Sequence, residues 1–235
     1  MFLGRCQAGA ASDGCNDQCR RRNRPLRGPR ISDSLGFESR PTLPHIIAEL
    51  GLHAELADDS SVRGTAPVLD DACQPGTRWL RTSVLATWAD MVTGMSASHS
   101  ILPRIPVTLD LETQLIRPVE AGTELLVESR PVKSGRTVAV SDARFMDRAT
   151  GELVAISYAT FVASANPDHV MGGGFPSVLP AETLLDVPLT ERVQLRAIAP
   201  GVMELPRLPD GQNMTGAIQG GLLAQEDGAQ ILVLG

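Results

Sequence analysis

Long apolar runs and basic charge are both scarce in this sequence. No stretch of about eighteen apolar residues occurs, so we expect no membrane-spanning helix. The net charge is −6, although residues 1–30 hold seven arginines against only Asp13 and Asp17. The rest of the chain is therefore strongly acidic. Because neutralising phosphates requires a basic surface, we expect no nucleic-acid partner.

Cysteine and aromatic residues are also few. Three of the four cysteines, Cys6, Cys15 and Cys19, lie in the first forty residues, and no histidine nearer than His45 completes a metal site there. Four cysteines in this arrangement form no disulfide framework, which favours a reducing, cytoplasmic location. Aromatic residues make up only 3% of the chain. The core must therefore be built from aliphatic side chains and methionine.

Composition divides the chain into four parts. Residues 1–42 are rich in Arg, Gly, Ser and Pro without periodicity, which predicts a disordered tail. Residues 43–165 carry the strongest periodic patterns and form the predicted main domain. Residues 166–185 include three consecutive glycines and several prolines, which are typical of a linker. Residues 186–235 repeat the opening of the main domain and are considered below.

The main domain reads as a long helix followed by four strands. Apolar residues recur every three or four positions from Leu80 to Ser98, which predicts a helix with one buried stripe. From Val107 the period becomes two, with Val107, Leu109, Leu111 and Leu115 expected to face the core. Three more β-prone runs follow between glycine-containing turns. The pattern predicts an α+β fold, an antiparallel sheet curled around the helix. These runs are Glu124–Pro131, Thr137–Phe145 and Leu153–Val162.

The C-terminal part resembles the start of the main domain. The segments 193–198 and 202–205 are similar to the predicted first strand at Val62–Leu69. The segment 213–224 is similar to the helix start at Leu80–Ala86. The chain ends at Gly235 before any counterpart of the four strands, so we expect a truncated second copy.

Asp90 is the most conspicuous polar residue of the predicted helix. At 100° per residue it shares a face with Ser83, opposite the apolar stripe that contains Trp88 and Met91. Small residues surround it on that face, which leaves room for a ligand. A carboxylate beside such space is a candidate base for chemistry at a carbonyl, which also needs oxyanion donors such as the amides of a helix N-terminus. Asp90 lies about 10 Å along the axis from Ser83, so one helix cannot supply both groups. The site is therefore expected to form between two copies of the unit.

Three stretches resemble the hotdog-fold acyl-CoA thioesterases of the phenylacetate-pathway (PaaI-like) type. They are Leu85–Asp90, Val107–Pro118 and the pair Gly135-Arg136. The resemblance implies a sheet wrapped around a central helix, pairing of two hotdog units and hydrolysis of an acyl-CoA thioester. It implies no cofactor, because the CoA belongs to the substrate. Asn213 followed by Gln219-Gly220-Gly221 resembles the Asn…His-Gly-Gly helix start of the same family, with Gln in place of His.

The resemblance also implies residue roles. Asp90 is the expected general base or nucleophile. Its oxyanion donors come either from Thr82 and Ser83 of a homodimer or higher oligomer, or from the second copy within the chain. The alternative function is a non-catalytic acyl-CoA-binding protein, which the incomplete second copy favours. A hydratase is a third candidate, but His99 is the only histidine near the helix. The second-copy donors are Asn213, Gln219, Gly220 and Gly221. The expected CoA-phosphate contacts are Lys133, Gly135 and Arg136, for which a charged hairpin tip is the equal alternative.

Overall fold

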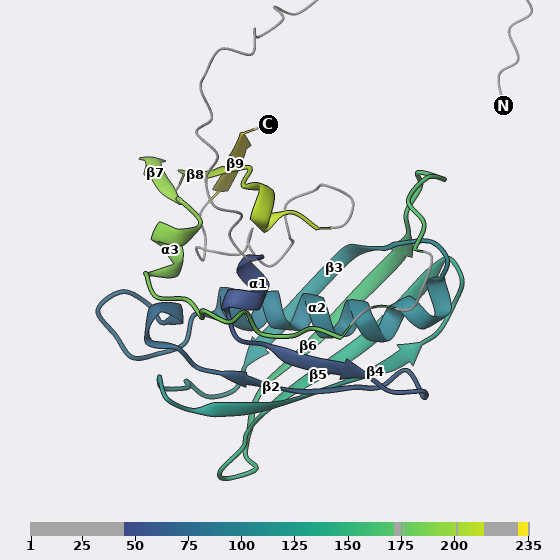
Figure 1. Ribbon diagram of the computed structural model, residues 1–235, viewed down its shortest axis with the longest axis horizontal. Helices are drawn as coiled ribbons and strands as arrows, with labels where there is room; N and C mark the ends of the chain where they lie inside the picture. The colour runs from purple at the N-terminus through teal and green to yellow at the C-terminus, as the bar shows by residue number, and fades with distance from the viewer. Residues whose placement is uncertain (1–44, 172–174, 176, 201, 214–229, 235) are drawn as a thin grey trace, which may run out of the picture. The chain divides into compact units, whose positions relative to one another are not determined.

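A central helix, α2, organises the structure (Figure 1). The computed structural model describes residues 45–171, 175, 177–200, 202–213 and 230–234, within the compact unit Thr42–Gly235. Helix α2 runs from Thr82 to Ile101, close to the range that periodicity predicts. It ends before Pro103, because the residue that precedes a proline is disfavoured in the helical conformation.

Helix α2 is buried on nearly every side, not along one stripe as its sequence predicts. Only Thr82, Met91, His99 and Ser100 escape the buried class. Three of its buried hydroxyls, those of Thr87, Thr93 and Ser98, bond back to helix carbonyls, which satisfies them inside the protein. A helix enclosed in this way needs cover on the side that the sheet leaves open.

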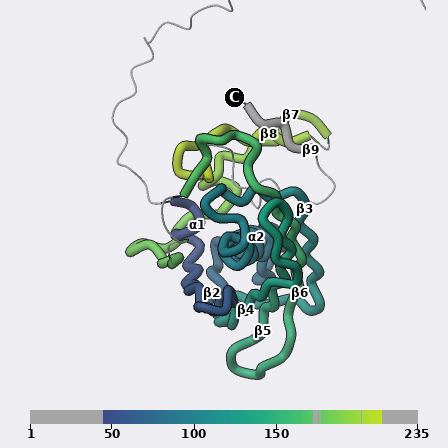
Figure 2. The backbone as a smooth tube through the Cα atoms, turned by 90° about the vertical axis from the view of Figure 1, so that its right-hand side faces the viewer, coloured from purple at the N-terminus to yellow at the C-terminus, as the bar shows by residue number. Residues whose placement is uncertain are grey.

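A six-stranded antiparallel sheet curls around α2, which Figure 2 shows nearly end-on. The strand order is β1-β2-β4-β5-β6-β3, so β1 and β3 form the two edges. The four strands after the helix lie within a few residues of their predicted ranges, and β2 matches the predicted first strand. The hairpin partner β1 was not predicted. The strands are β1 (His53–Leu56), β2 (Val62–Pro67), β3 (Pro106–Leu115), β4 (Glu124–Lys133), β5 (Val138–Asp147) and β6 (Leu153–Ala163).

A β-bulge reverses the predicted orientation of the first part of β3. Thr108 pairs with Phe161 and Asp110 with the next residue of β6, Thr160, so Leu109 is an extra residue. One inserted residue exchanges the two faces of a strand. Thr108 consequently turns toward α2, while Leu109 is 67% exposed and Val107 is 37% exposed. The prediction that Val107 and Leu109 face the core was wrong, and Leu115, at the end of the strand, is likewise 41% exposed.

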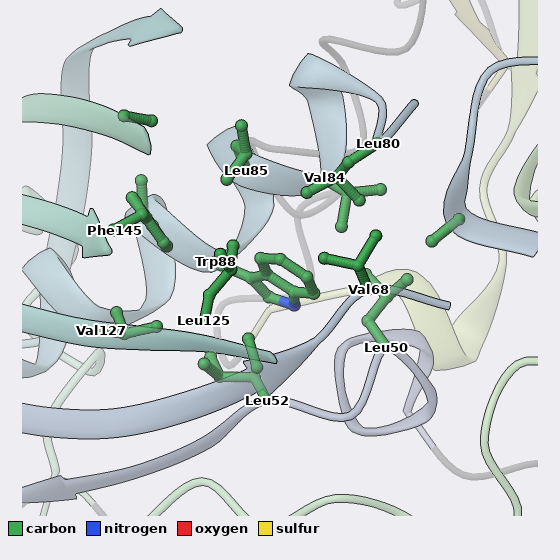
Figure 3. Close-up of a cluster of buried hydrophobic side chains, with 14 of the residues drawn as sticks. Leu50, Leu52, Val68, Leu80, Val84, Leu85, Trp88, Leu125, Val127 and Phe145 are labelled. Carbon is green, nitrogen blue, oxygen red and sulfur yellow. The ribbon is translucent and has the colours of Figure 1, made fainter. Parts of the chain in front are cut away.

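Trp88 lies at the centre of the main apolar cluster (Figure 3). It is fully buried against side chains from α2, from the sheet and from α1 (Ile46–Glu49), the short helix that precedes β1. The predicted burial of Trp88 within the apolar stripe is confirmed. Labelled neighbours in the figure are Leu50, Leu52, Val68, Leu80, Val84, Leu85, Leu125, Val127 and Phe145.

The described residues of the predicted linker, 166–171, 175 and 177–185, pack along the main domain and form what we call the strap. At one end Val170 bridges to Arg104, just before β3, and at the other Val178 bridges to Ala54 in β1. Leu185 is buried in the core and donates its N–H to the Glu49 carbonyl. The strap therefore joins the two edges of the curled sheet, and its later part passes alongside α2 in Figure 1.

The C-terminal part repeats the order of elements at the start of the described chain. Helix α1, strands β1 and β2 and a 3-10 turn, η2 (Asp70–Ala72), correspond to α3 (Leu189–Arg192), β7 (Arg196–Ala199), β8 (Val202–Pro206) and η3 (Pro209–Gly211). Both short helices are followed by a positive φ, at Gly51 and Gln194. Strand β9 (Gln230–Leu234) lies parallel to β8. The predicted tail at 1–42 and the predicted helix start at 214–224 lie outside the described residues. Among the described helices none is long and apolar enough to cross a membrane.

Candidate active site

Asp90 lies in the middle of α2, with its carboxylate held by strand β3. The Thr108 hydroxyl donates a hydrogen bond of 2.7 Å to Asp90 Oδ1. The bulge at Leu109 makes this contact possible, because without the bulge Thr108 would face the opposite side of the sheet. Asp90 is 6% exposed. The fold therefore orients a nearly buried carboxylate.

Burial raises the pKa of Asp90 above its ordinary value, and the Thr108 hydrogen bond opposes that rise without reversing it. Removing a carboxylate from water disfavours its charged form, whereas a donor to that form favours it. A carboxylate with a raised pKa is a stronger base than an exposed one. Such a shift in a cavity is typical of an acid–base catalyst.

Asp90 opens onto a cavity of about 350 Å³. Its walls come from α2, the start of β3, β6, α1, the strap and the residues that follow η3. Met91, predicted on the face opposite Asp90, lines the same cavity, because adjacent helix positions are only 100° apart. Most lining side chains are apolar, with a few polar groups among them, as in sites for small molecules. The lining residues are His45, Ile47, Ala48, Asp90, Met91, Gly94, Ile105, Pro106, Val107, Thr108, Phe161, Phe175, Ser177, Val178, Leu179, Gln212 and Asn213.

Asn213 lies in the wall of the cavity that holds Asp90, although 122 positions separate the two in sequence. Two of the predicted site residues are thus brought together, one from each of the two copies that the sequence suggests. The other predicted donors of the second copy, Gln219, Gly220 and Gly221, lie outside the described residues. The chain itself supplies a second wall to the candidate site.

His45 ties this second wall to the main domain. Its Nε2 lies 2.9 Å from the Gln212 carbonyl oxygen, and its Nδ1 accepts from the Ile47 N–H at 3.2 Å. These partners require the tautomer with the proton on Nε2. Because both ring nitrogens are engaged with backbone groups, His45 is a structural residue of the cavity and not a candidate base.

A buried ion cluster fixes the same wall. Arg192 of α3 donates to both carboxylate oxygens of Glu49, at 2.6 and 2.8 Å, and to Asp210 of η3 at 2.5 Å. The side chains are only 8–17% exposed. Asp210 precedes Gln212 and Asn213 by two and three residues. Arg192 therefore connects α1, α3 and the cavity wall through charge-assisted hydrogen bonds.

Thr82 and Ser83, the other predicted donors, do not line the cavity of their own chain. They lie at the N-terminus of α2, about two turns from Asp90. Their predicted role requires the Asp90 of a second molecule and stays a prediction. The buried Ser83 hydroxyl has no hydrogen-bond partner among the described residues.

We expect Ser83→Ala to raise the free energy of unfolding by about 1 kcal/mol, because it removes an unsatisfied buried hydroxyl and improves helix propensity. Thermal and urea unfolding measure the change. Ser98→Ala is the matched control, since that buried hydroxyl bonds to the Met95 carbonyl at 2.6 Å and its loss is expected to bring no gain. A Ser83→Ala protein less stable than wild type would show that the hydroxyl has a partner.

The raised pKa of Asp90 predicts how its replacement affects stability. At neutral pH the buried, ionised Asp90 carboxylate destabilises the folded chain, because water solvates the same charge in the unfolded chain. Asp90→Asn removes that cost, so the variant should unfold at a higher temperature than wild type near pH 7. Below the ordinary pKa of aspartate both states of the wild type are protonated, and the difference should vanish. Melting curves from acid to neutral pH test this, and a difference independent of pH would contradict it.

Lys133, Gly135 and Arg136 lie at the turn between β4 and β5, outside the cavity lining. Lys133 and Arg136 are exposed. A Cβ on Gly135 would lie 2.6 Å from the Val138 carbonyl oxygen, so the turn requires glycine there. The Ala163 N–H bonds to the Thr137 carbonyl, and Ala163 also pairs with Pro106. The turn thus lies at the end of the sheet that borders the cavity.

Sequence reasoning missed Thr108, His45 and the strap. Thr108 reads as an outward residue unless the bulge is known. Long-range packing brings His45 and the strap residues Phe175 and Val178 into the wall of the cavity that holds Asp90, and no local pattern marks them. Among the described residues, no group of three His, Cys, Asp or Glu side chains could hold a metal ion.

The central part of the chain matches a known protein family. Residues 82–154 match the sequence model of the thioesterase superfamily. We call this matched stretch the thioesterase-superfamily segment. It spans α2 to the start of β6 and includes both Asp90 and Thr108. With the sheet curled around α2, it confirms the predicted α+β hotdog fold. Asn213 and the strap lie outside the thioesterase-superfamily segment.

Solved structures similar to this chain include several thioesterases. Zebrafish thioesterase superfamily member 2 is 22% identical, with 56% of this chain and 89% of that chain covered and a TM-score of 0.46. A putative thioesterase from Ralstonia eutropha, a phenylacetic acid degradation-related protein, is 23% identical over 53% and 94%, with a TM-score of 0.46. A Streptococcus mutans protein bound to acetyl CoA is 19% identical over 55% and 96%, with a TM-score of 0.44. No curated protein matches the chain.

Proposed function

We propose that this protein is an acyl-CoA thioesterase in which Asp90 is the general base. The observation that carries the proposal is the oriented, nearly buried Asp90 carboxylate that opens onto a largely apolar cavity. The thioesterase-superfamily match over residues 82–154 supports thioester hydrolysis as the class of reaction.

The proposed reaction adds water across the thioester. Asp90 takes a proton from a water molecule as its oxygen attacks the carbonyl carbon, which gives a tetrahedral intermediate with a negative oxygen. The C–S bond then breaks, and the departing CoA sulfur takes up the proton that Asp90 held. The products are a carboxylic acid and CoA, and Asp90 returns to its ionised form. Thr108 keeps the carboxylate aimed throughout.

The oxyanion needs hydrogen-bond donors on the side of the carbonyl away from the base. Asn213 is our candidate within the described chain, because it lines the same cavity as Asp90. The predicted donors Gln219, Gly220 and Gly221 follow it closely in sequence. Supply of these donors by the C-terminal part of the same chain accords with a partial second hotdog repeat. The repeated element order from α3 to η3 supports that repeat.

Lys133 and Arg136 remain our candidates for CoA phosphates. The turn that carries them lies two strands away from β3 in the sheet order β5-β6-β3, which corresponds to about 10 Å. A thioester bound at Asp90 places its phosphates well away from the carbonyl, so exposed cations at this end of the sheet suit them.

Hydrolysis of a panel of acyl-CoAs, from acetyl to palmitoyl and including benzoyl, tests the proposal. Release of the CoA thiol measures turnover directly. Turnover on some member of the panel is expected. If the protein binds acyl-CoA but hydrolyses none, the proposal is wrong and the non-catalytic binding protein takes its place.

A further inference from the structure

The cavity exists because the strap covers the open side of the curled sheet. Strand β3 lies at one edge of the sheet and β1 at the other, with α2 between them. Described strap residues contact both edges, since Val170 bridges to Arg104 just before β3 and Val178 bridges to Ala54 of β1. Without a covering segment, the face of α2 that bears Asp90 would form an open groove.

Val178 is the most firmly held strap residue in the cavity wall. Its N–H and C=O exchange two 2.9 Å hydrogen bonds with Ala54 of β1. Val178 is half-buried, packs against the main apolar cluster and is one of the residues that line the cavity. Because backbone bonds fix Val178, its side chain can be exchanged while the strap stays in place. The position is thus a fixed point from which side-chain size alters the cavity.

Helix α2 contributes Asp90, Met91 and Gly94 to the cavity wall. Gly94 lies one helical turn beyond Asp90, and a Cβ added to it would lie 3.4 Å from the Phe161 ring. Glycine costs about 1 kcal/mol relative to alanine in a helix interior. We therefore ascribe the glycine at position 94 to the space that it leaves beside the Phe161 ring. Apolar side chains surround that space, as an acyl group requires.

From this arrangement we infer that Val178 is a specificity-determining residue, which limits the acyl group to compact chains and rings. The inference rests on the proposed thioesterase function. A cavity of about 350 Å³ is at the lower end of the range for small-molecule sites. Hexanoyl- and benzoyl-CoA are expected to be better substrates than palmitoyl-CoA. The strap lies outside the thioesterase-superfamily match, so this selectivity belongs to the part of the chain beyond that segment.

The test compares side chains of different size at two strap positions. Val178→Phe fills the cavity and should lower the ratio of kcat/KM for hexanoyl-CoA to that for acetyl-CoA by about tenfold, whereas Val178→Ala should raise it a few-fold. Val170→Phe and Val170→Ala are the controls, since Val170 is 55% exposed on the same strap and outside the cavity lining. They should leave the ratio unchanged.

The experiment distinguishes failure of the inference about Val178 from failure of the proposed thioesterase function. If wild type hydrolyses acyl-CoAs but Val178 and Val170 variants give equal ratios, the inference is overturned while the thioesterase function stands. If wild type hydrolyses none, the proposed function fails. In that case calorimetric binding of hexanoyl- and acetyl-CoA to the same variants reads the length preference without turnover. Equal affinity ratios for the Val178 and Val170 variants would again overturn the inference.

Discussion

We expect Asp90→Asn to lower the rate of acyl-CoA hydrolysis by a factor of about 10² to 10⁴, which is the usual contribution of a general base. The substitution keeps the size of the side chain and an oxygen that accepts from the Thr108 hydroxyl, which lies 2.7 Å from Asp90 Oδ1. It removes only the group that accepts the proton. Binding of acyl-CoA should therefore survive, and thiol-release kinetics with parallel calorimetry measure both quantities.

Asp110→Asn is the matched control, because this carboxylate is exposed two residues after Thr108 on the same strand. It should leave turnover unchanged. In wild type, kcat/KM should rise with pH through a pKa above the ordinary aspartate value, since burial raises the pKa of Asp90. Normal turnover in the Asp90→Asn variant would eliminate Asp90 as the base. A single turnover in ¹⁸O water distinguishes base from nucleophile, because only a nucleophile acquires the label in its own carboxylate.

Arg192→Met should lower the free energy of unfolding by about 3–5 kcal/mol, the range for breaking a buried ion pair by removing one partner. The Arg192 side chain is 11% exposed and bonds to Glu49 and Asp210. Methionine fills similar volume but leaves two buried carboxylates without their cation. Chemical unfolding at neutral pH measures the loss.

Arg196→Met is the control for this change, since Arg196 pairs with Glu204 while its side chain is 66% exposed. An exposed pair contributes about 0–1 kcal/mol, so the control should unfold much as wild type does. Because Asp210 leads directly into Gln212 and Asn213, Arg192→Met should also raise KM for acyl-CoA. Equal stability of the two variants would contradict the structural role given to the buried cluster.

Several expectations from the sequence stay predictions. The homodimer or higher oligomer and the cytoplasmic location are among them. So is the role of Thr82 and Ser83 as donors to a second molecule. Val107 and Leu109, exposed on the edge strand β3, are where a second copy would find apolar contacts, and sedimentation of the purified protein decides the oligomeric state.

The helix and the four strands that follow it are legible in the sequence alone. Their periodicities of about 3.6 and 2 are local properties, and the register shifts within β4 to β6 fall near strand ends, between Pro131 and Lys133 and between Phe145 and Met146. The motif at Leu85–Asp90 is likewise local, and it is sufficient to select Asp90 as the candidate base. The prediction failed at β3, because a bulge at Leu109 depends on pairing with β6 and leaves no mark in the local pattern.

The surroundings of Asp90 depend on long-range packing. The bulge brings Thr108 to the carboxylate, while the Arg192 cluster and pairing with β1 hold Asn213 and Val178 in the wall of the same cavity. Each contact joins residues far apart in the sequence, and each depends on burial and hydrogen bonding that form only when the segments meet. A segment rich in glycine and proline reads as a linker when taken alone. It becomes a cavity wall because the open edges of a curled sheet offer it unpaired backbone groups and apolar surface.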